Sequence, residues 1–147
     1  MSLTTPYDPQ NIFARILRGD APCYTIHEDD DVLAFLDLFP QSVGHTLVIP
    51  KHSAAVNMLD VDTGALCQVM AVVQRLTRVI VDELQPDGVQ VAQFNGAAAG
   101  QTVFHIHVHI VPRYAGQDTG VHAAQEAGHG ELEKLQARLV RRLAASS

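Results

Sequence analysis

The stretch Phe104-His105-Ile106-His107-Val108-His109-Ile110-Val111 alternates apolar side chains with imidazoles. Strict alternation is typical of a β-strand, in which successive side chains point to opposite faces of the sheet. We therefore expect the three histidines to share one face, with the apolar residues packed against a core on the other. A single buried histidine is usually structural. Three in this pattern make that interpretation weak, because each buried ring needs its own hydrogen-bond partner.

Alternating histidines can also bind zinc, and this alternative stays open. Residues two apart on a strand lie roughly 6.6 Å apart along its axis, and residues four apart roughly 13 Å. A zinc–nitrogen bond is only about 2.0–2.1 Å long. His105 and His109 would therefore have to lean strongly toward each other to share one ion with His107, and no Cys or Glu lies close by in the sequence. The pattern places a metal site second.

A nucleophilic imidazole makes better use of the three histidines. To attack a phosphorus atom, a histidine must present a neutral Nε2, so an acceptor must hold the proton of Nδ1. A backbone carbonyl on the same strand can be that acceptor, while flanking imidazoles donate to phosphate oxygens and to the leaving atom. Attack produces a covalent phosphoryl- or nucleotidyl-histidine, which divides one difficult displacement into two easier steps.

The rest of the sequence indicates an α+β domain built on an antiparallel sheet. Short strand-like runs are separated by turn residues such as Asp29–Asp31. Apolar residues recur every three or four positions from about Asp60 to Leu84, which predicts one long amphipathic helix. The first helix is expected to have Asp8 as its N-cap, Pro9 at its first position and Gly19 as its stop. The expected strands are 23–28, 32–38, 45–50, 89–95 and 102–111, and the last helix is 131–144.

Composition limits the class of partner. A chain of 147 residues, 47% of them hydrophobic, fits one domain (1–147) with its own core. The formal net charge of -6 argues against nucleic acid, and the absence of a long uninterrupted apolar run argues against a membrane span. The N-terminus lacks the pattern of a secretory signal, and Cys23 and Cys67 are unlike a disulfide framework. These features predict a cytoplasmic protein.

With these residues in view, the sequence resembles the histidine triad (HIT) superfamily of nucleotide hydrolases and transferases, in its bacterial form. The triad is complete, with its lead-in Gly100–Phe104 and its trailing Pro112-Arg113. The segment 28–52, EDDDVLAFLDLFPQSVGHTLVIPKH, is similar to the family's second signature and contains His45. The resemblance runs from about residue 11 to 113 and leaves 114–147 as a tail with a helix. It implies a five-stranded antiparallel sheet, one long helix, one or two shorter helices and a homodimer.

The resemblance also implies roles for the polar residues. His107 would be the nucleophile, and His109 would donate to the phosphate and help to protonate the leaving group. His105 would orient its neighbours, with its main-chain carbonyl holding His107. His45 would complete the histidine network, although a buried strand-end histidine is the plainer interpretation. Asp37 would bind the ribose diol, although from the residues alone it is a turn-forming aspartate.

Other positions match the nucleotide-binding residues of the family. They are Ile12, Phe13, Ile16, Phe35 and Leu38 around the base, and Asn95, Gly100, Gln101 and Thr102 around the phosphate or ribose. Periodicity alone assigns most of the apolar ones to a core, and Asn95 is equally suited to cap a turn.

The sequence departs from the family in two places. Relatives often bind a structural zinc through a Cys-x-x-Cys pair near the N-terminus, where this chain has Asn11 and Ala14. We therefore expect no zinc site and no cofactor, with His52 on the surface. Thr102 stands where some relatives have a leaving-group serine. The tail, with Gly116, Gly120, His122 and His129, matches no assigned function.

The leading interpretation is hydrolysis of purine nucleoside phosphoramidates, or of related nucleoside monophosphate derivatives, at the α-phosphate through a nucleotidyl-histidine. Cleavage of diadenosine polyphosphates is the alternative within the same class. A nucleotide-binding or scaffolding protein with little catalysis, and a metal-dependent enzyme that uses His105 and His107 as ligands, are the alternatives outside it.

Overall fold

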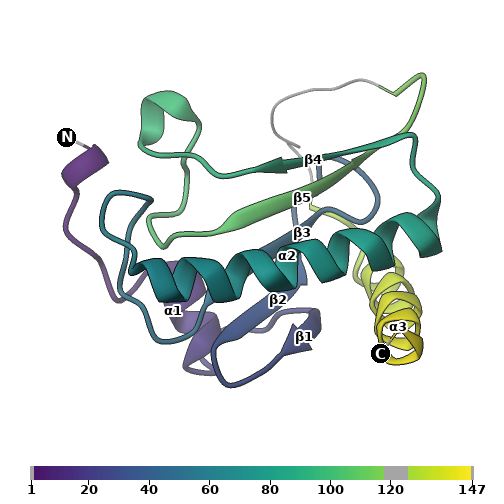
Figure 1. The fold of residues 1–147 in the computed structure, drawn as a ribbon, viewed down its shortest axis with the longest axis horizontal. Coiled ribbons are helices and arrows are strands. Elements are labelled where there is room, and N and C mark those ends of the chain that lie inside the picture. Colours follow the sequence, from purple (N-terminus) through teal and green to yellow (C-terminus); the bar gives the residue numbers. More distant parts are fainter. Residues whose placement is uncertain (1, 118–125, 147) are drawn as a thin grey trace.

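Five antiparallel strands form one sheet in the order β1-β2-β3-β5-β4 (Figure 1). The computed structural model describes residues 2–117 and 126–146. Three α-helices and two short 3-10 helices accompany the sheet within these residues. The elements are η1 (Ser2–Thr4), α1 (Ile12–Leu17), β1 (Thr25–Glu28), β2 (Val32–Leu36), β3 (Thr46–Pro50), α2 (Thr63–Leu84), β4 (Gly88–Ala92), η2 (Ala97–Ala99), β5 (Val108–Arg113) and α3 (His129–Ala145). The α+β class and the five-stranded antiparallel sheet are confirmed.

The helix α2 covers one face of the sheet and makes the main core. Its buried residues Val73, Leu76 and Ile80 pack with Val108 and Ile110 of β5 and with alternate residues of the neighbouring strands. The C-terminal helix α3 adds buried leucines to the same cluster. Figure 1 shows α2 lying along the sheet, with α3 at its C-terminal end. The apolar side chains of β5 therefore point to α2, as their alternation predicts.

The opposite face of the sheet carries a smaller cluster beside α1. Phe13 of α1 packs there with Phe35 of β2, and the two rings are 5.5 Å apart in an edge-on arrangement. Leu47 of β3, in the same cluster, pairs with His109 of β5 in the sheet register. This face therefore combines apolar side chains with histidines.

The helix α2 also has the length and mean hydropathy (1.3) of a membrane span. Its inward residues, among them Val69 and Val73, are nevertheless buried against the sheet. It also carries Arg75, Arg78 and Asp82 on its exposed side. A helix with one buried apolar stripe and one charged stripe is the amphipathic helix of a packed domain.

The strand β5 begins at Val108, whereas the alternation predicted a strand from Thr102. Its pairing with β3 stops at Val48↔Val108. Two positions further along β3 is Pro50, which has no N–H to donate to a ladder. The N–H of Ile106 instead donates to the Ala55 carbonyl at 2.9 Å. His105 and His107 therefore precede the strand, and only His109 lies within it.

Two helix starts also differ from the sequence prediction. The cap of α1 is Asn11, whose Oδ1 accepts the N–H of Ala14 at 2.9 Å, and Asp8 lies in the preceding turn. The cap of α2 is Asp62. The carboxylate of Asp60 instead accepts the N–H groups of Val56 and Asn57, each at 3.0 Å, and closes the loop before the helix.

Candidate active site

A cavity of about 360 Å³ opens on the α1 side of the sheet, where the segment 28–52 meets the triad. Its walls are mainly apolar, and its polar side chains gather at one end. Of the residues singled out from the sequence, ten line it: Ile12, Phe13, Ile16, Phe35, Asp37, Leu38, His45, Thr102, His107 and His109. Chain segments far apart in sequence therefore build one site.

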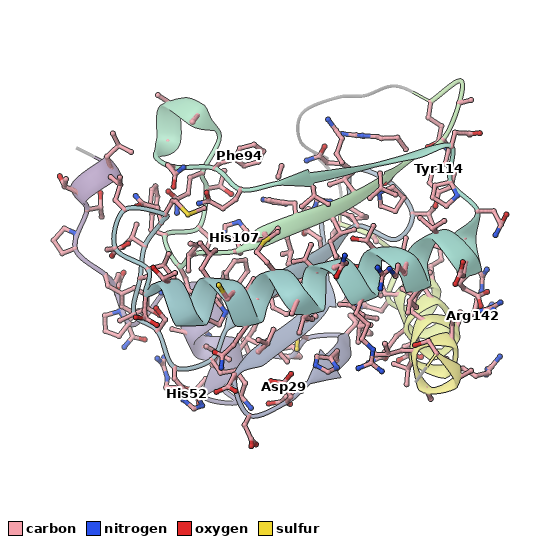
Figure 2. All side chains as sticks on the ribbon, viewed as in Figure 1. Asp29, His52, Phe94, His107, Tyr114 and Arg142 are labelled. Carbon is pink, nitrogen blue, oxygen red and sulfur yellow. The ribbon has the colours of Figure 1, made fainter. Side chains whose placement is uncertain are left out.

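His107 is held in one tautomer by the backbone before it. Its Nδ1 lies 2.8 Å from the carbonyl oxygen of His105. Because a carbonyl only accepts, Nδ1 carries the proton and Nε2 presents a lone pair. The rings of Phe13 and His107 pack in a T-shaped arrangement at a centroid distance of 4.9 Å. Burial lowers the pKa of His107 below its usual range, so the ring is neutral at neutral pH. Figure 2 shows this histidine just before β5.

His105 is fully buried and does not line the cavity. Its Nε2 faces the carbonyl of Pro50 at 3.3 Å, and its Nδ1 lies 2.7 Å from the hydroxyl of Tyr7. The carbonyl can only accept, so Nε2 is the protonated nitrogen and the Tyr7 hydroxyl donates to Nδ1. Burial lowers the pKa of His105 to about 4.

His45 and His109 form a second pair at the polar end of the cavity. The backbone N–H of Gln41 donates to Nδ1 of His45 at 3.0 Å, and Nε2 of His45 lies 3.0 Å from Nδ1 of His109. Since Nδ1 of His45 accepts, its Nε2 carries the proton and donates to His109. In neutral His109 the remaining proton is then on Nε2. The ring centroids of His107 and His109 are 4.8 Å apart, so the ring that presents this donor lies next to the ring that presents the lone pair.

A glycine allows His45 to reach this position. Gly44 has φ +98, and a Cβ added to it would lie 2.5 Å from Leu84 Cδ1 and 3.1 Å from Pro112 Cγ. Neither the conformation nor the space suits another residue. The loop before His45 therefore packs directly on the end of α2 and on β5.

Asp37 both forms a turn and lines the cavity. Its Oδ1 accepts the N–H of Phe39 at 2.9 Å, and its Oδ2 lies 3.5 Å from Nε2 of His45. Asp37, His45 and His109 are close enough together to be considered as metal ligands. A metal on Nε2 of His45 would require a proton on Nδ1, directly opposite the N–H of Gln41. This arrangement favours a proton-ordered network over a metal site.

Three predicted nucleotide-binding residues lie outside the cavity lining. The side-chain oxygen of Asn95 accepts the N–H of Met58 at 2.8 Å. Gln101 is buried, accepting the N–H of Gly96 at 2.8 Å and donating to the Val56 carbonyl at 2.7 Å. Gly100, with φ +105, ends η2. Through these bonds the loop 95–101 is braced against residues 56–58.

The family model described as "HIT domain" matches residues 18–116. This chain belongs to the HIT family. Among similar proteins, "Protein hit" of Bacillus subtilis is 39% identical over 140 residues, covering 92% of this chain and 95% of that one. "Adenylylsulfatase HINT3" of Arabidopsis thaliana is 38% identical over 103 residues, covering 69% of this chain and 51% of that one.

Solved HIT structures share the fold. A Hit-like protein from Bartonella henselae, described as involved in cell-cycle regulation, has a TM-score of 0.88 at 40% identity, covering 94% of this chain and 99% of that one. A zinc-bound histidine triad protein from Mycobacterium smegmatis has a TM-score of 0.80 at 37% identity, covering 92% of this chain and 94% of that one. A histidine triad nucleotide-binding protein from Sulfolobus tokodaii has a TM-score of 0.82 at 32% identity, covering 90% of this chain and 91% of that one. The chain is thus a member of a superfamily of nucleotide-binding hydrolases and transferases.

The positions that set this chain apart from zinc-binding HIT proteins have other uses here. Asn11 caps α1 and Ala14 is buried in that helix, so neither offers a thiolate. His52 is exposed, with its Nε2 2.6 Å from the Asp30 carbonyl, and Figure 2 shows it at the β1–β2 turn, away from His107. In the tail, His129 begins α3, and its Nδ1 lies 2.6 Å from the Tyr24 hydroxyl. Gly120 and His122 lie outside the described residues.

Sequence reasoning missed several contributors to the HIT site. Tyr7 is 98 residues from the histidine that it contacts, and Gln41 contributes through its backbone N–H. Phe94 packs on His109 with ring centroids 5.3 Å apart. The remaining cavity residues are Pro22, Cys23, Leu36, Phe39, Gln41, Leu47 and Val103. The matched segments held a signal for most of them, because Leu36, Phe39, Gln41 and Leu47 fall within 28–52 and Val103 falls within the lead-in Gly100–Phe104.

Proposed function

We propose that this HIT protein hydrolyses purine nucleoside phosphoramidates, or related nucleoside monophosphate derivatives, at the α-phosphorus through a covalent nucleotidyl-histidine on His107. The observation that carries the proposal is the 2.8 Å contact between Nδ1 of His107 and the His105 carbonyl. It leaves Nε2 as the unprotonated nitrogen of a neutral, buried ring that forms part of the cavity wall. A protein that only bound nucleotides would not need a ring held in this tautomer.

The proposed reaction has two displacements. Nε2 of His107 attacks phosphorus, the bond from phosphorus to the leaving nitrogen breaks, and the electron pair stays on that nitrogen. Water then attacks phosphorus, breaks the P–Nε2 bond and releases the nucleoside monophosphate. Over both steps one water is consumed: its hydroxyl becomes bonded to phosphorus, and its proton replaces the one that the leaving amine takes up. His109 donates from Nε2 to the leaving atom or a phosphate oxygen, stabilising the charge that develops there and carrying the proton.

The apolar walls of the cavity suit a flat base. Phe13, Ile16 and Phe35 provide apolar contacts there, and Asp37 lies at the polar end, where its carboxylate can accept both hydroxyls of a ribose. Thr102 is exposed at the cavity edge, where its hydroxyl can reach the leaving group. An apolar slot that ends in a carboxylate and a histidine nucleophile supports a nucleotide derivative as the substrate.

The test compares leaving groups on one nucleotide. Turnover of adenosine 5′-phosphoramidate, adenylyl sulfate and a diadenosine polyphosphate is measured with wild type, His107→Ala and His52→Ala, the last replacing an exposed histidine as a control. We expect the phosphoramidate to have the highest kcat/KM, with activity lost only in His107→Ala. The adenylyl sulfate arm is included because of the adenylylsulfatase relative. Faster cleavage of the dinucleotide would contradict the substrate class, and nucleotide binding without any turnover would favour the scaffolding alternative.

The proposed setting is the cytoplasm, with purine nucleotides as ligands and neither nucleic acid nor a membrane as a partner. Two features support it. Cys23 and Cys67 are both free thiols, and the formal net charge is -6.

A further inference from the structure

The carbonyl that orients the proposed nucleophile lies outside the sheet. His105 precedes β5, which starts only at Val108, so no ladder hydrogen bonds hold the peptide that follows His105. Three other contacts hold this part of the chain instead. They are the N–H of Ile106 on the Ala55 carbonyl at 2.9 Å, Nε2 of His105 on the Pro50 carbonyl at 3.3 Å, and the Tyr7 hydroxyl on Nδ1 of His105 at 2.7 Å.

The Tyr7 contact is the shortest of the three, and it comes from the N-terminal segment. That segment is itself attached to the domain, because the side chain of the buried Asn57 donates to the Leu3 carbonyl at 3.1 Å. The rings of Tyr7 and His105 are 5.6 Å apart and tilted. Tyr7 does not line the cavity, so it is not placed to touch a nucleotide bound there.

The tautomer of His105 depends on this hydroxyl. With Nε2–H on the Pro50 carbonyl, Nδ1 is a buried acceptor that needs a donor, and the Tyr7 hydroxyl is one. If the hydroxyl is lost, the ring must either leave Nδ1 unsatisfied or move its proton to Nδ1 and leave the Pro50 carbonyl without its donor. In either case the ring position that anchors the His105 carbonyl is less well defined.

We propose that Tyr7 is a positioning residue. Its hydroxyl fixes the tautomer and position of the His105 ring, and the His105 carbonyl in turn fixes Nδ1–H on His107. The kinetic consequence rests on the proposed function, because it requires His107 to be the nucleophile. The structural consequence, a single tautomer at both histidines, does not require any reaction.

The experiment compares Tyr7→Phe with Tyr24→Phe. Tyr24 is the matched control because its hydroxyl makes the same contact with Nδ1 of a histidine, His129, at 2.6 Å, and it does not line the cavity. Two quantities are measured in each variant: kcat and KM for a nucleotide substrate, and the tautomers of His105 and His107 by nitrogen NMR of the imidazoles. Thermal melting monitors the fold.

We expect Tyr7→Phe to lower kcat about three- to tenfold with little change in KM, the size expected for the loss of one neutral hydrogen bond. His107 should then populate a mixture of tautomers, while Tyr24→Phe should match wild type in both measurements. An unchanged kcat with unchanged His107 tautomers would overturn the proposal. A fall in kcat that Tyr24→Phe shows as well, and that follows the fall in melting temperature in both variants, would also overturn it. If wild type turns over no substrate, the proposed function fails, and the NMR comparison alone decides the positioning role.

Discussion

Nε2 of His45 donates to Nδ1 of His109 across 3.0 Å, and the direction of that bond is set by the backbone of Gln41. Because the N–H of Gln41 occupies Nδ1 of His45, the proton of the His45–His109 pair has one orientation. His109 consequently presents a donor to the cavity, whereas His107, held by the His105 carbonyl, presents a lone pair. Two adjacent imidazoles thus have opposite hydrogen-bonding roles, which is the asymmetry that nucleophilic attack on a phosphate requires.

The acid side of the activity profile should have its midpoint below pH 6.5. His107 attacks only when neutral, and burial lowers its pKa from 6.5. Activity is therefore retained as pH falls to 6.5 and is lost only as pH passes through the lower value. The measurement is kcat/KM against pH, which reports the free enzyme, with a substrate whose phosphate does not titrate between about pH 4 and 7. A midpoint at or above 6.5 would mean that a more exposed group controls the reaction.

His109→Ala should affect substrates unequally. Loss of one donor to the transition state costs about 10²–10³-fold in enzymes that stabilise an oxyanion. We expect a loss of that order with an alkylamine leaving group, which needs a proton. The loss should be much smaller with a nitrophenolate, which does not. Equal losses with both leaving groups would contradict the donor role of His109, and His52→Ala serves as the control.

Local patterns predicted most of the fold. Apolar runs bounded by turn residues located β2 and β3 to within two residues, and the spacing of Leu76 and Ile80 located α2. The errors arose where the outcome depends on contacts distant in sequence. Alternation continues through 104–111, but a strand needs a partner, and Pro50 on β3 cannot extend the ladder. Asp8 and Asn11 are both good caps, and sequence alone does not choose between them.

The sequence predicted the histidines of the site better than the groups that hydrogen-bond to them. The alternation of imidazoles pointed to His107 and His109, and the second signature pointed to Asp37 and His45, all of which line the cavity. The donors that decide the tautomers have no local signature, because one is the hydroxyl of Tyr7 and the other is the peptide N–H of Gln41. Asn95 and Gln101 have side chains suited to phosphate, but Asn95 accepts the backbone N–H of Met58, and Gln101 is bonded to the backbone of Gly96 and Val56.

We expect a homodimer, with β4 and the outer side of α2 at the interface. Among the described residues β4 pairs only with β5, and Val91 on β4 is 46% exposed. Met70 and Val81 on α2 are also exposed. Light scattering at micromolar concentration should give about twice the chain mass of 15.9 kDa. Val91→Glu should shift the protein toward monomer, because a charge on an edge strand opposes pairing. A wild-type mass near 15.9 kDa would contradict this prediction.

Purified protein should contain no stoichiometric zinc and should keep its fold and activity in chelator. Asn11 and Ala14 stand where the sequence resemblance implies a zinc-binding Cys pair, and the N–H of Gln41 opposes a metal on Nε2 of His45. Elemental analysis and circular dichroism before and after exhaustive chelation test this. About one zinc per chain, or loss of turnover that zinc restores, would revive the metal-dependent interpretation of the triad.

The covalent intermediate is the most direct test of the account. A nucleotide substrate labelled in its base is mixed rapidly with enzyme and quenched without acid, which would hydrolyse a phosphorus–nitrogen bond. Label should appear on wild-type protein, at His107 in peptide mapping, and should be absent from His107→Ala. That variant should bind nucleotide with similar affinity and lose roughly 10⁴-fold or more in turnover, which corresponds to an activation barrier raised by about 5 kcal/mol. If His107→Ala instead retained near wild-type turnover, water would attack phosphorus directly and the assigned roles would be wrong.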